Sequence, residues 1–167
     1  MVANLTVGKK GYEKGWGELS AMAVKAQALK DALMRAVDED TRAFDAVMAA
    51  MKLPKASAGQ EAARNAAVEE ANKAAADVPL ATAEACLEAI VFCADAARLG
   101  NKASASDAGV GALLARAGCE GAALNVITNL GSIADEAFKA DRRARAEELV
   151  RKADSACKDV LAVVGAH

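Results

Sequence analysis

Apolar residues recur at three- and four-residue intervals along nearly the whole chain, the spacing of an α-helix with one buried face. β-branched residues are scattered and aromatic residues are rare, so almost no segment resembles a strand. The pattern predicts an all-α fold, an antiparallel bundle of about five to six helices. We expect one domain over residues 1–167, because a chain of this length supports a single core.

Glycine and proline mark where the first helices end. A short helix is expected from Met1 to about Val7, stopping at Gly8, and the longest one over residues 18–51, stopping at Leu53-Pro54. The next helix should begin at a capping box formed by Ser57 and Gln60.

Proline and short polar side chains punctuate the second half of the chain. Val78-Pro79 predicts a break or kink before a helix over residues 80–99, which Gly100-Asn101 closes. Ser104 and Asp107 match a second capping box, for a helix that runs to about Leu130. The last helix should start after Gly131-Ser132.

Composition and charge exclude several function classes. Aromatic residues make up only 3% of the chain, so the core must be aliphatic and rich in alanine. A net charge of −2 without a basic face argues against nucleic-acid binding. No apolar run approaches the roughly 20 residues needed to span a bilayer. We therefore expect no membrane contact and a cytoplasmic location.

Four cysteines and a single histidine limit the chemistry that is available. Cys86, Cys93, Cys119 and Cys157 include no C-x-x-C pair, so reduced thiols packed in the core are expected. The only histidine, His167, is the last residue, and no conventional metal site or Cys-His or Ser-His nucleophile pair can be assembled. We predict no metal, and any catalysis must use carboxylates, amides, hydroxyls or lysines.

One carboxylate interrupts the apolar stripe of the long helix. On a helical wheel, Asp40 lies within roughly 40° of six apolar residues, whereas Asp38 lies roughly 160° away and Glu39 about 100° away. The six are Leu29, Leu33, Ala36, Phe44, Val47 and Met51. An acid on a buried face would have a raised pKa and suit proton transfer. An acid that only bonds a facing side chain and fixes helix register is an equally open interpretation.

Other polar groups have competing roles. Asp107 suits the capping box, and capping is favoured over catalysis on spacing alone. Asn125 and Asn129 share a helix face and could bind a polar heterocycle, although interhelical hydrogen bonds explain them equally well. Lys9 and Lys10 would suit an anionic ligand tail, but a lysine pair is more often solvated surface.

The chain resembles the cyclodeaminase/cyclohydrolase family of folate enzymes in seven segments that keep the family's order and spacing. The segments are residues 1–10, Val37-Asp38-Glu39-Asp40 through Phe44, Leu53-Pro54-Lys55, Val78-Pro79-Leu80, Gly100-Asn101, Ser106-Asp107, and Asn125-Val126 through Phe138. Family members carry a glycine-rich loop and helix upstream of Met1. We therefore expect this chain to begin inside the family's first long helix.

The resemblance implies the ligand and the roles of the residues. It implies a tetrahydrofolate derivative as substrate, no further cofactor, a homodimer, and a possible fused or associated formimidoyltransferase. Asp40 is the implied catalytic acid or base, with Asp38 and Asp107 as further candidates, and Lys9, Lys10, Asn125 and Asn129 as folate contacts.

Three functions are carried forward. The first is cyclodeamination, in which N10 of 5-formiminotetrahydrofolate attacks the formimino carbon and ammonia leaves, with Asp40 moving the protons. The second is the cyclohydrolase reaction, in which Asp40 activates water against the cationic methenyl carbon. The third is a non-catalytic helical module that binds folate or a second copy of itself.

Overall fold

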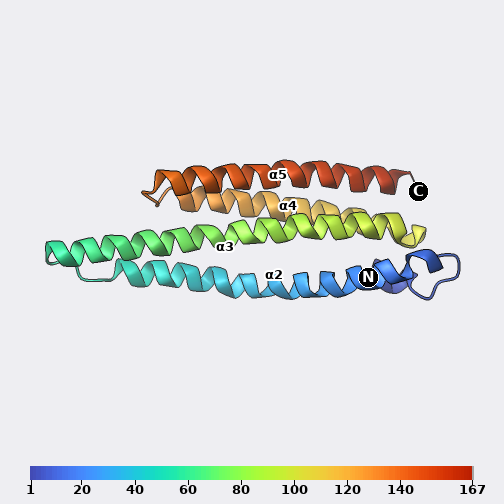
Figure 1. The fold of residues 1–167 in the computed structure, drawn as a ribbon, viewed down its shortest axis with the longest axis horizontal. Helices are drawn as coiled ribbons and strands as arrows, with labels where there is room; N and C mark the ends of the chain where they lie inside the picture. Colours follow the sequence, from blue (N-terminus) through green and yellow to red (C-terminus); the bar gives the residue numbers. More distant parts are fainter. Residues whose placement is uncertain (167) are drawn as a thin grey trace.

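The computed structural model describes residues 1–166 as a long helical bundle, and His167 lies outside the described residues. Five α-helices occur: α1 (Val2–Thr6), α2 (Trp16–Met51), α3 (Ala58–Leu99), α4 (Ala105–Leu130) and α5 (Glu136–Gly165). Two 3₁₀ turns, Glu13–Gly15 and Lys102–Ser104, precede α2 and α4. The four long helices run in alternating directions (Figure 1). The prediction of an all-α antiparallel bundle is confirmed.

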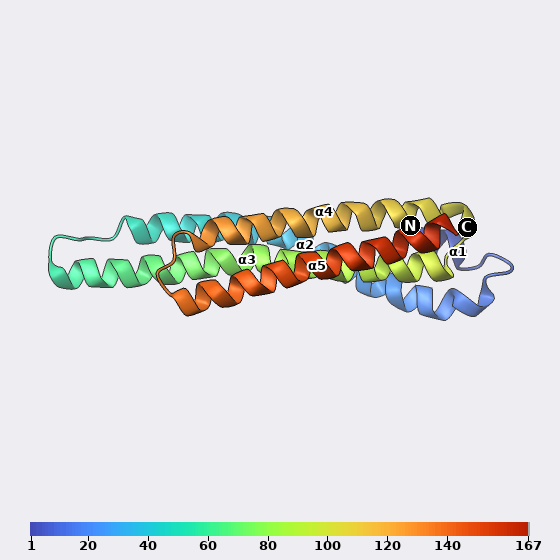
Figure 2. The same cartoon turned by 90° about the horizontal axis from the view of Figure 1, so that it is seen from above.

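The core lies between α3, α4 and α5, which pack against one another side by side (Figure 2). Small and aliphatic side chains fill it, because alanines let the helix axes approach closely. Its fully buried members include Ala83, Ile90, Ala112, Cys119, Val126, Leu130 and Val160. Helix α2 packs mainly on α3, and only Leu19, Val47 and Ala50 of its residues are buried.

Helix α3 begins as its sequence predicts. The Ser57 hydroxyl accepts a hydrogen bond from the Gln60 amide, and the Gln60 side chain accepts one from the Ser57 amide, so the capping box is formed. Gly100 caps the other end. Val78-Pro79 predicted a break or a kink, and the break does not occur, because α3 continues past Pro79. A side chain of α4, that of Asn129, donates to the α3 carbonyl that the missing amide of Pro79 leaves without its usual donor.

The start of α4 differs from the prediction. The Ser104 hydroxyl donates to the Asn101 carbonyl at 2.9 Å and makes no capping bond to α4, so the capping box with Asp107 is not formed. Asn101 instead caps the preceding turn through the Ala103 amide. The bond to Asn101 orients the Ser104 hydroxyl toward the preceding turn, so its oxygen does not accept from an amide of α4.

Helix α4 is also more apolar than expected. Within the described residues, one segment, Lys102–Leu130, is long and apolar enough to cross a membrane by length and composition alone. The prediction that no apolar run reaches this length is therefore wrong. The criterion is weak evidence for a membrane span, because helices of water-soluble bundles meet it too. Here α4 packs against α3 and α5.

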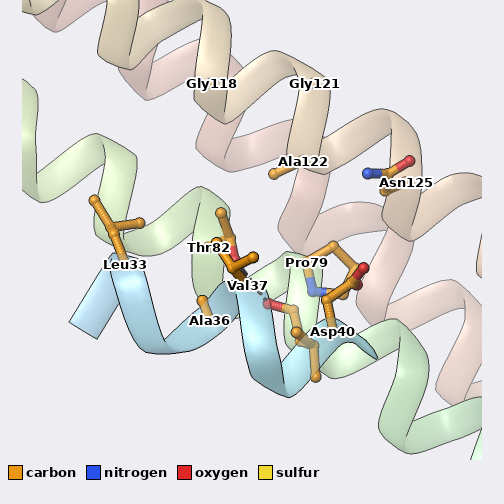
Figure 3. A pocket seen from close by; sticks show the side chains of 11 residues that line it. Leu33, Ala36, Val37, Asp40, Pro79, Thr82, Gly118, Gly121, Ala122 and Asn125 are labelled. Atoms are coloured by element: carbon orange, nitrogen blue, oxygen red, sulfur yellow. Dashed lines mark hydrogen bonds between the residues drawn. The ribbon is translucent and has the colours of Figure 1, made fainter. Parts of the chain in front are cut away.

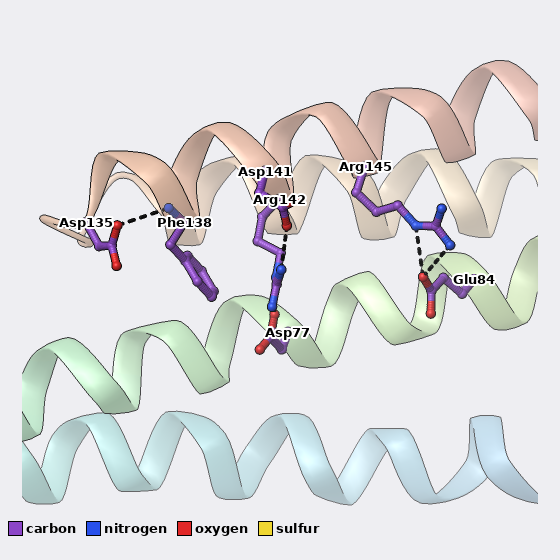
Figure 4. Close-up of polar contacts among 7 residues, drawn as sticks. All are labelled: Asp77, Glu84, Asp135, Phe138, Asp141, Arg142 and Arg145. Atoms are coloured by element: carbon purple, nitrogen blue, oxygen red, sulfur yellow. Dashed lines mark hydrogen bonds and ion pairs between the residues drawn. The ribbon is translucent and has the colours of Figure 1, made fainter.

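Helix α5 is fixed to α3 by charge as well as by apolar packing. Asp135 caps it by accepting from the Phe138 amide at 3.0 Å. Arg142 pairs with Asp77 at 2.7 Å and Arg145 with Glu84 at 3.0 Å (Figure 4). These pairs lie at the edge of the interface and set the register of the two helices more than they add stability.

Candidate active site

A groove runs between α2 and α4, with α3 as its floor. At its middle is a cavity of about 270 Å³ lined by residues of all three helices. Figure 3 shows Asp40 on α2, Pro79 and Thr82 on α3, and Asn125 on α4 around this cavity. A second cavity of about 350 Å³ adjoins it and shares Asp40 and Asn125. Asp40 therefore stands where the two cavities meet.

Among residues 1–166, Asp40 is the only ionisable side chain that lines either cavity. Its neighbours in the first cavity are mostly apolar or lack a side chain, and among the described residues that line the two cavities none is lysine, arginine or histidine. The Asp40 carboxylate therefore has no cationic side chain beside it in these cavities. A carboxylate in this position can stabilise a ligand that carries a positive charge.

The apolar stripe of α2 around Asp40 is less buried than predicted. Val47 is buried and Leu33 is half-buried, but Val37 is 65% exposed, Phe44 is 63% exposed and Asp40 is exposed. The prediction of a buried acid is therefore wrong for the single chain. The physical reason is that α2 packs chiefly on α3 and otherwise touches α1 and the turn before α2, so the rest of its apolar stripe faces the open groove.

The small residues of α4 make room for the groove. Gly118 and Gly121 line the first cavity, about two turns and one turn before Asn125. A side chain at Gly118 would meet the Cys86 sulfur at 3.0 Å, whereas one at Gly121 would meet no atom within 4 Å. Gly118 is thus needed for helix packing, and Gly121 leaves space open in the cavity. Their spacing with Asn125 and Asn129 on one helix face was a signal that our sequence analysis did not use.

The second cavity is polar. Asn72, Asn125, Thr128, Asn129 and Ser132 line it together with Asp40. The Asn129 side-chain amide donates to the Ala75 carbonyl at 2.8 Å, and that of Asn72 donates to the Ser132 carbonyl at 3.0 Å. The interhelical hydrogen bond considered for Asn129 is present, while Asn125 makes none among the described residues.

Asp38 lies away from the groove. It lines neither cavity, it is exposed, and its nearest charged partner is Arg42 at 3.9 Å on the same helix. The wheel predicted this separation from Asp40. The catalytic role that the resemblance suggested for Asp38 stays a prediction, with no support from its position in one chain.

Asp107 and the two lysines lie far from Asp40 within one chain. Asp107 lines a third cavity of about 760 Å³ near α1, and about 27 Å of helix α4 separate it from Asn125. Lys9 and Lys10 are exposed and precede α2, whose first turn lies about 36 Å along the helix from Asp40. Lys9 contacts the Tyr12 ring at 5.5 Å. The seven predicted residues therefore do not form one site in a single chain.

The thiols play no part in this groove as nucleophiles. All four cysteines are unpaired, and burial raises the pKa of Cys119 to about 11 and that of Cys86 and Cys93 above its ordinary value. A thiol with a raised pKa stays protonated near neutral pH and is a weak nucleophile.

Comparison with known proteins shows the family to which this chain belongs. The sequence model of the formiminotransferase-cyclodeaminase family matches residues 1–148. The chain belongs to this family. It is 42% identical to the methenyltetrahydrofolate cyclohydrolase of Methylorubrum extorquens over 153 residues, which cover 92% of this chain and 74% of that protein.

Two further comparisons are with proteins less similar to this chain. The formimidoyltransferase-cyclodeaminase of Sus scrofa is 35% identical over 96% of this chain, which spans 30% of that protein. The crystal structure of the formiminotetrahydrofolate cyclodeaminase of Thermotoga maritima superposes with a TM-score of 0.86 at 29% identity, covering 99% of this chain and 79% of that one. The helical architecture is thus that of the family.

Proposed function

We propose that the chain is a folate one-carbon enzyme, a methenyltetrahydrofolate cyclohydrolase, with Asp40 as its catalytic group. The observation that carries the proposal is the lone carboxylate in a groove without basic side chains. The 5,10-methenyl carbon of the substrate lies between two nitrogens that share a positive charge. A carboxylate placed beside it stabilises that charge and can take a proton from water.

The reaction needs only this group and water. Asp40 accepts a proton as the water oxygen bonds to the methenyl carbon, which gives a neutral adduct. The bond from this carbon to N5 then breaks, N5 receives a proton from Asp40, and the adduct hydroxyl loses its own proton to solvent as the formyl group forms on N10. One proton is released overall, and no further cofactor is required.

The comparisons with known proteins reverse the order of the two enzymatic hypotheses. Sequence reasoning placed cyclodeamination first, but the cyclohydrolase of Methylorubrum extorquens is more similar to this chain than the Sus scrofa protein. Cyclodeamination stays the second candidate, supported by the fold shared with the Thermotoga maritima enzyme. In that reaction Asp40 would accept the N10 proton and then protonate the leaving nitrogen.

Steady-state kinetics of Asp40→Asn test the proposal. We expect kcat/KM for methenyltetrahydrofolate to fall by about 10²- to 10⁴-fold, because a general base is lost. The unfolding midpoint should not change, since Asp40 is exposed. Asp45→Asn is the matched control, because Asp45 is also exposed on α2 and lines neither cavity.

The outcomes separate the three hypotheses. Equal rates for the two variants would refute the role of Asp40. Turnover of 5-formiminotetrahydrofolate with release of ammonia, without turnover of the methenyl compound, would favour the cyclodeaminase. Folate binding by calorimetry without either reaction would favour the non-catalytic module.

We also propose that the chain acts as a homodimer. Val37 and Phe44 on α2 and Leu114 and Leu124 on α4 are each more than 60% exposed, which is a large apolar surface for a monomer. Sedimentation velocity at micromolar concentration should give a dimer, and a monomer would contradict this. Fusion to a formimidoyltransferase stays a prediction.

A further inference from the structure

Pro79 leaves one backbone carbonyl of α3 without its usual partner. In an α-helix the carbonyl of residue 75 accepts from the amide of residue 79, and proline has no amide hydrogen. The Asn129 side chain of α4 supplies the missing donor at 2.8 Å from the Ala75 oxygen. This bond explains how α3 passes Pro79 without breaking.

The same bond fixes the orientation of Asn129. Its side-chain amide carries an NH₂ donor on one side and a carbonyl acceptor on the other. Because the NH₂ group faces the Ala75 carbonyl, the amide oxygen is turned away from α3's backbone. Ala75 and Asn129 both line the 350 Å³ cavity beside Asp40.

Two further side chains of this cavity each commit a donor in the same way. Asn72, only 7% exposed, donates one N–H of its NH₂ group to the Ser132 carbonyl, and the Thr128 hydroxyl donates to the Leu124 carbonyl at 3.0 Å. Each engaged carboxamide keeps one further N–H and its acceptor oxygen, and Asn125 and Ser132 keep donors as well, whereas the Thr128 hydroxyl can only accept. With the carboxylate of Asp40, the oxygens of Thr128 and Asn129 supply acceptors for the N–H groups of a ligand.

We infer that the oxygens of Asn129 and Asp40 in this cavity form a subsite for the N–H edge of a heterocycle, and that Pro79 is the positioning residue that fixes the Asn129 side chain. The ligand class is a ring bearing an amino group next to a ring N–H, as in an aminopyrimidinone. The identity of that ring as part of the folate rests on the proposed function. A site whose polar groups are satisfied by N–H donors rejects an analogue that lacks them.

The ligand side of the inference is tested by binding, without turnover. Isothermal calorimetry compares 2-amino-4-oxopteridine with the analogue that lacks the 2-amino group. We expect the wild type to bind the amino compound roughly tenfold more tightly, the effect of about one hydrogen bond, and Asn129→Leu to lose most of this preference. Equal affinities in the wild type would overturn the subsite.

The role of Pro79 is tested by Pro79→Ala, which restores the amide hydrogen to α3. The Ala75 carbonyl can then pair within the helix, and the Asn129 amide is free to rotate. We expect KM for methenyltetrahydrofolate to rise roughly tenfold with little change in kcat, while thermal stability stays equal or increases. Loss of binding without loss of stability would not result from a merely structural role.

Two controls test whether the effect on KM is specific to Pro79 and acts through Asn129. Pro54→Ala changes the other proline, in the loop between α2 and α3, and should leave KM unchanged. The double variant Pro79→Ala/Asn129→Leu should have a KM no higher than that of Asn129→Leu alone, because both changes remove one interaction. A wild-type KM in Pro79→Ala, or effects that multiply in the double variant, would overturn the positioning role.

Failure of this inference differs from failure of the proposed function. If the wild type turns over neither folate but still discriminates between the two pteridines, the proposed function fails and the subsite stands. If it turns over methenyltetrahydrofolate but does not discriminate, the proposed function stands and the subsite fails. The Asn129 side-chain amide signals, identified in ¹H–¹⁵N spectra by their absence from Asn129→Leu, should exchange faster with solvent in Pro79→Ala.

Discussion

Helices α2 and α5 both lie along α3, but they are attached to it differently. Helix α5 buries Ala146, Leu149, Ala153, Cys157 and Val160 and pairs its arginines with Asp77 and Glu84. Helix α2 is longer yet buries three residues, and among the described residues its ion pair to α3 is that of Glu18 with Arg98, near its first turn. The firmly packed helix, α5, contributes to the core, whereas the loosely covered helix, α2, carries Asp40.

The largest effect of this difference should appear in core truncations. Leu149→Ala on α5 removes a 2% exposed side chain and should lower the free energy of unfolding by about 3 kcal/mol. Leu33→Ala on α2 removes a half-buried one beside the open groove and should cost about 1 kcal/mol. Urea unfolding monitored by circular dichroism measures both. Equal losses would mean that α2 is as firmly packed as α5.

A smaller effect is expected from filling the groove. Gly121→Leu should lower kcat/KM for the folate at least about tenfold, because the new side chain enters the cavity beside Asp40, while the fold is kept since no atom lies within 4 Å of its Cβ. Gly59→Leu, equally unobstructed in the first turn of α3, is the control. Unchanged kinetics for Gly121→Leu would show that ligand does not occupy this part of the groove.

The smallest expected effect is a pH dependence of the free energy of unfolding, which arises where α3 contacts the start of α5. Glu69 accepts hydrogen bonds from the Ala134 and Asp135 amides, which lower its pKa from 4.5, and the Phe138 amide and then Lys73 lower the pKa of Asp135 from 3.8. Both native pKa values lie below the unfolded ones. The stabilisation is therefore present above the unfolded values and is lost as pH falls through the native ones.

Urea midpoints between pH 7 and pH 3 test this attachment of α5. Glu69→Gln should be less stable at neutral pH and should lose less stability than the wild type below the ordinary pKa of 4.5. Glu88→Gln, an exposed position on α3, should follow the wild-type profile. Parallel profiles for all three proteins would show that Glu69 does not contribute to the attachment of α5.

The sequence alone determined the helices and the choice of Asp40. The helical period, Gly8, Pro54 and the Ser57–Gln60 capping box are local signals, since they depend on residues within a turn or two of each other. They predicted α2 and both ends of α3 to within about two residues. The wheel also separated Asp40 from Asp38 correctly.

Only the tertiary structure decided what surrounds these residues. The unbroken course of α3 at Pro79 depended on Asn129, 50 residues further along the chain, and the exposure of Asp40 depended on α2 packing chiefly on one long helix, α3. The separation of Asp107, Lys9 and Lys10 from Asp40 follows from helix length and direction. Periodicity specifies which face of a helix is apolar, but not which other helix, if any, covers it.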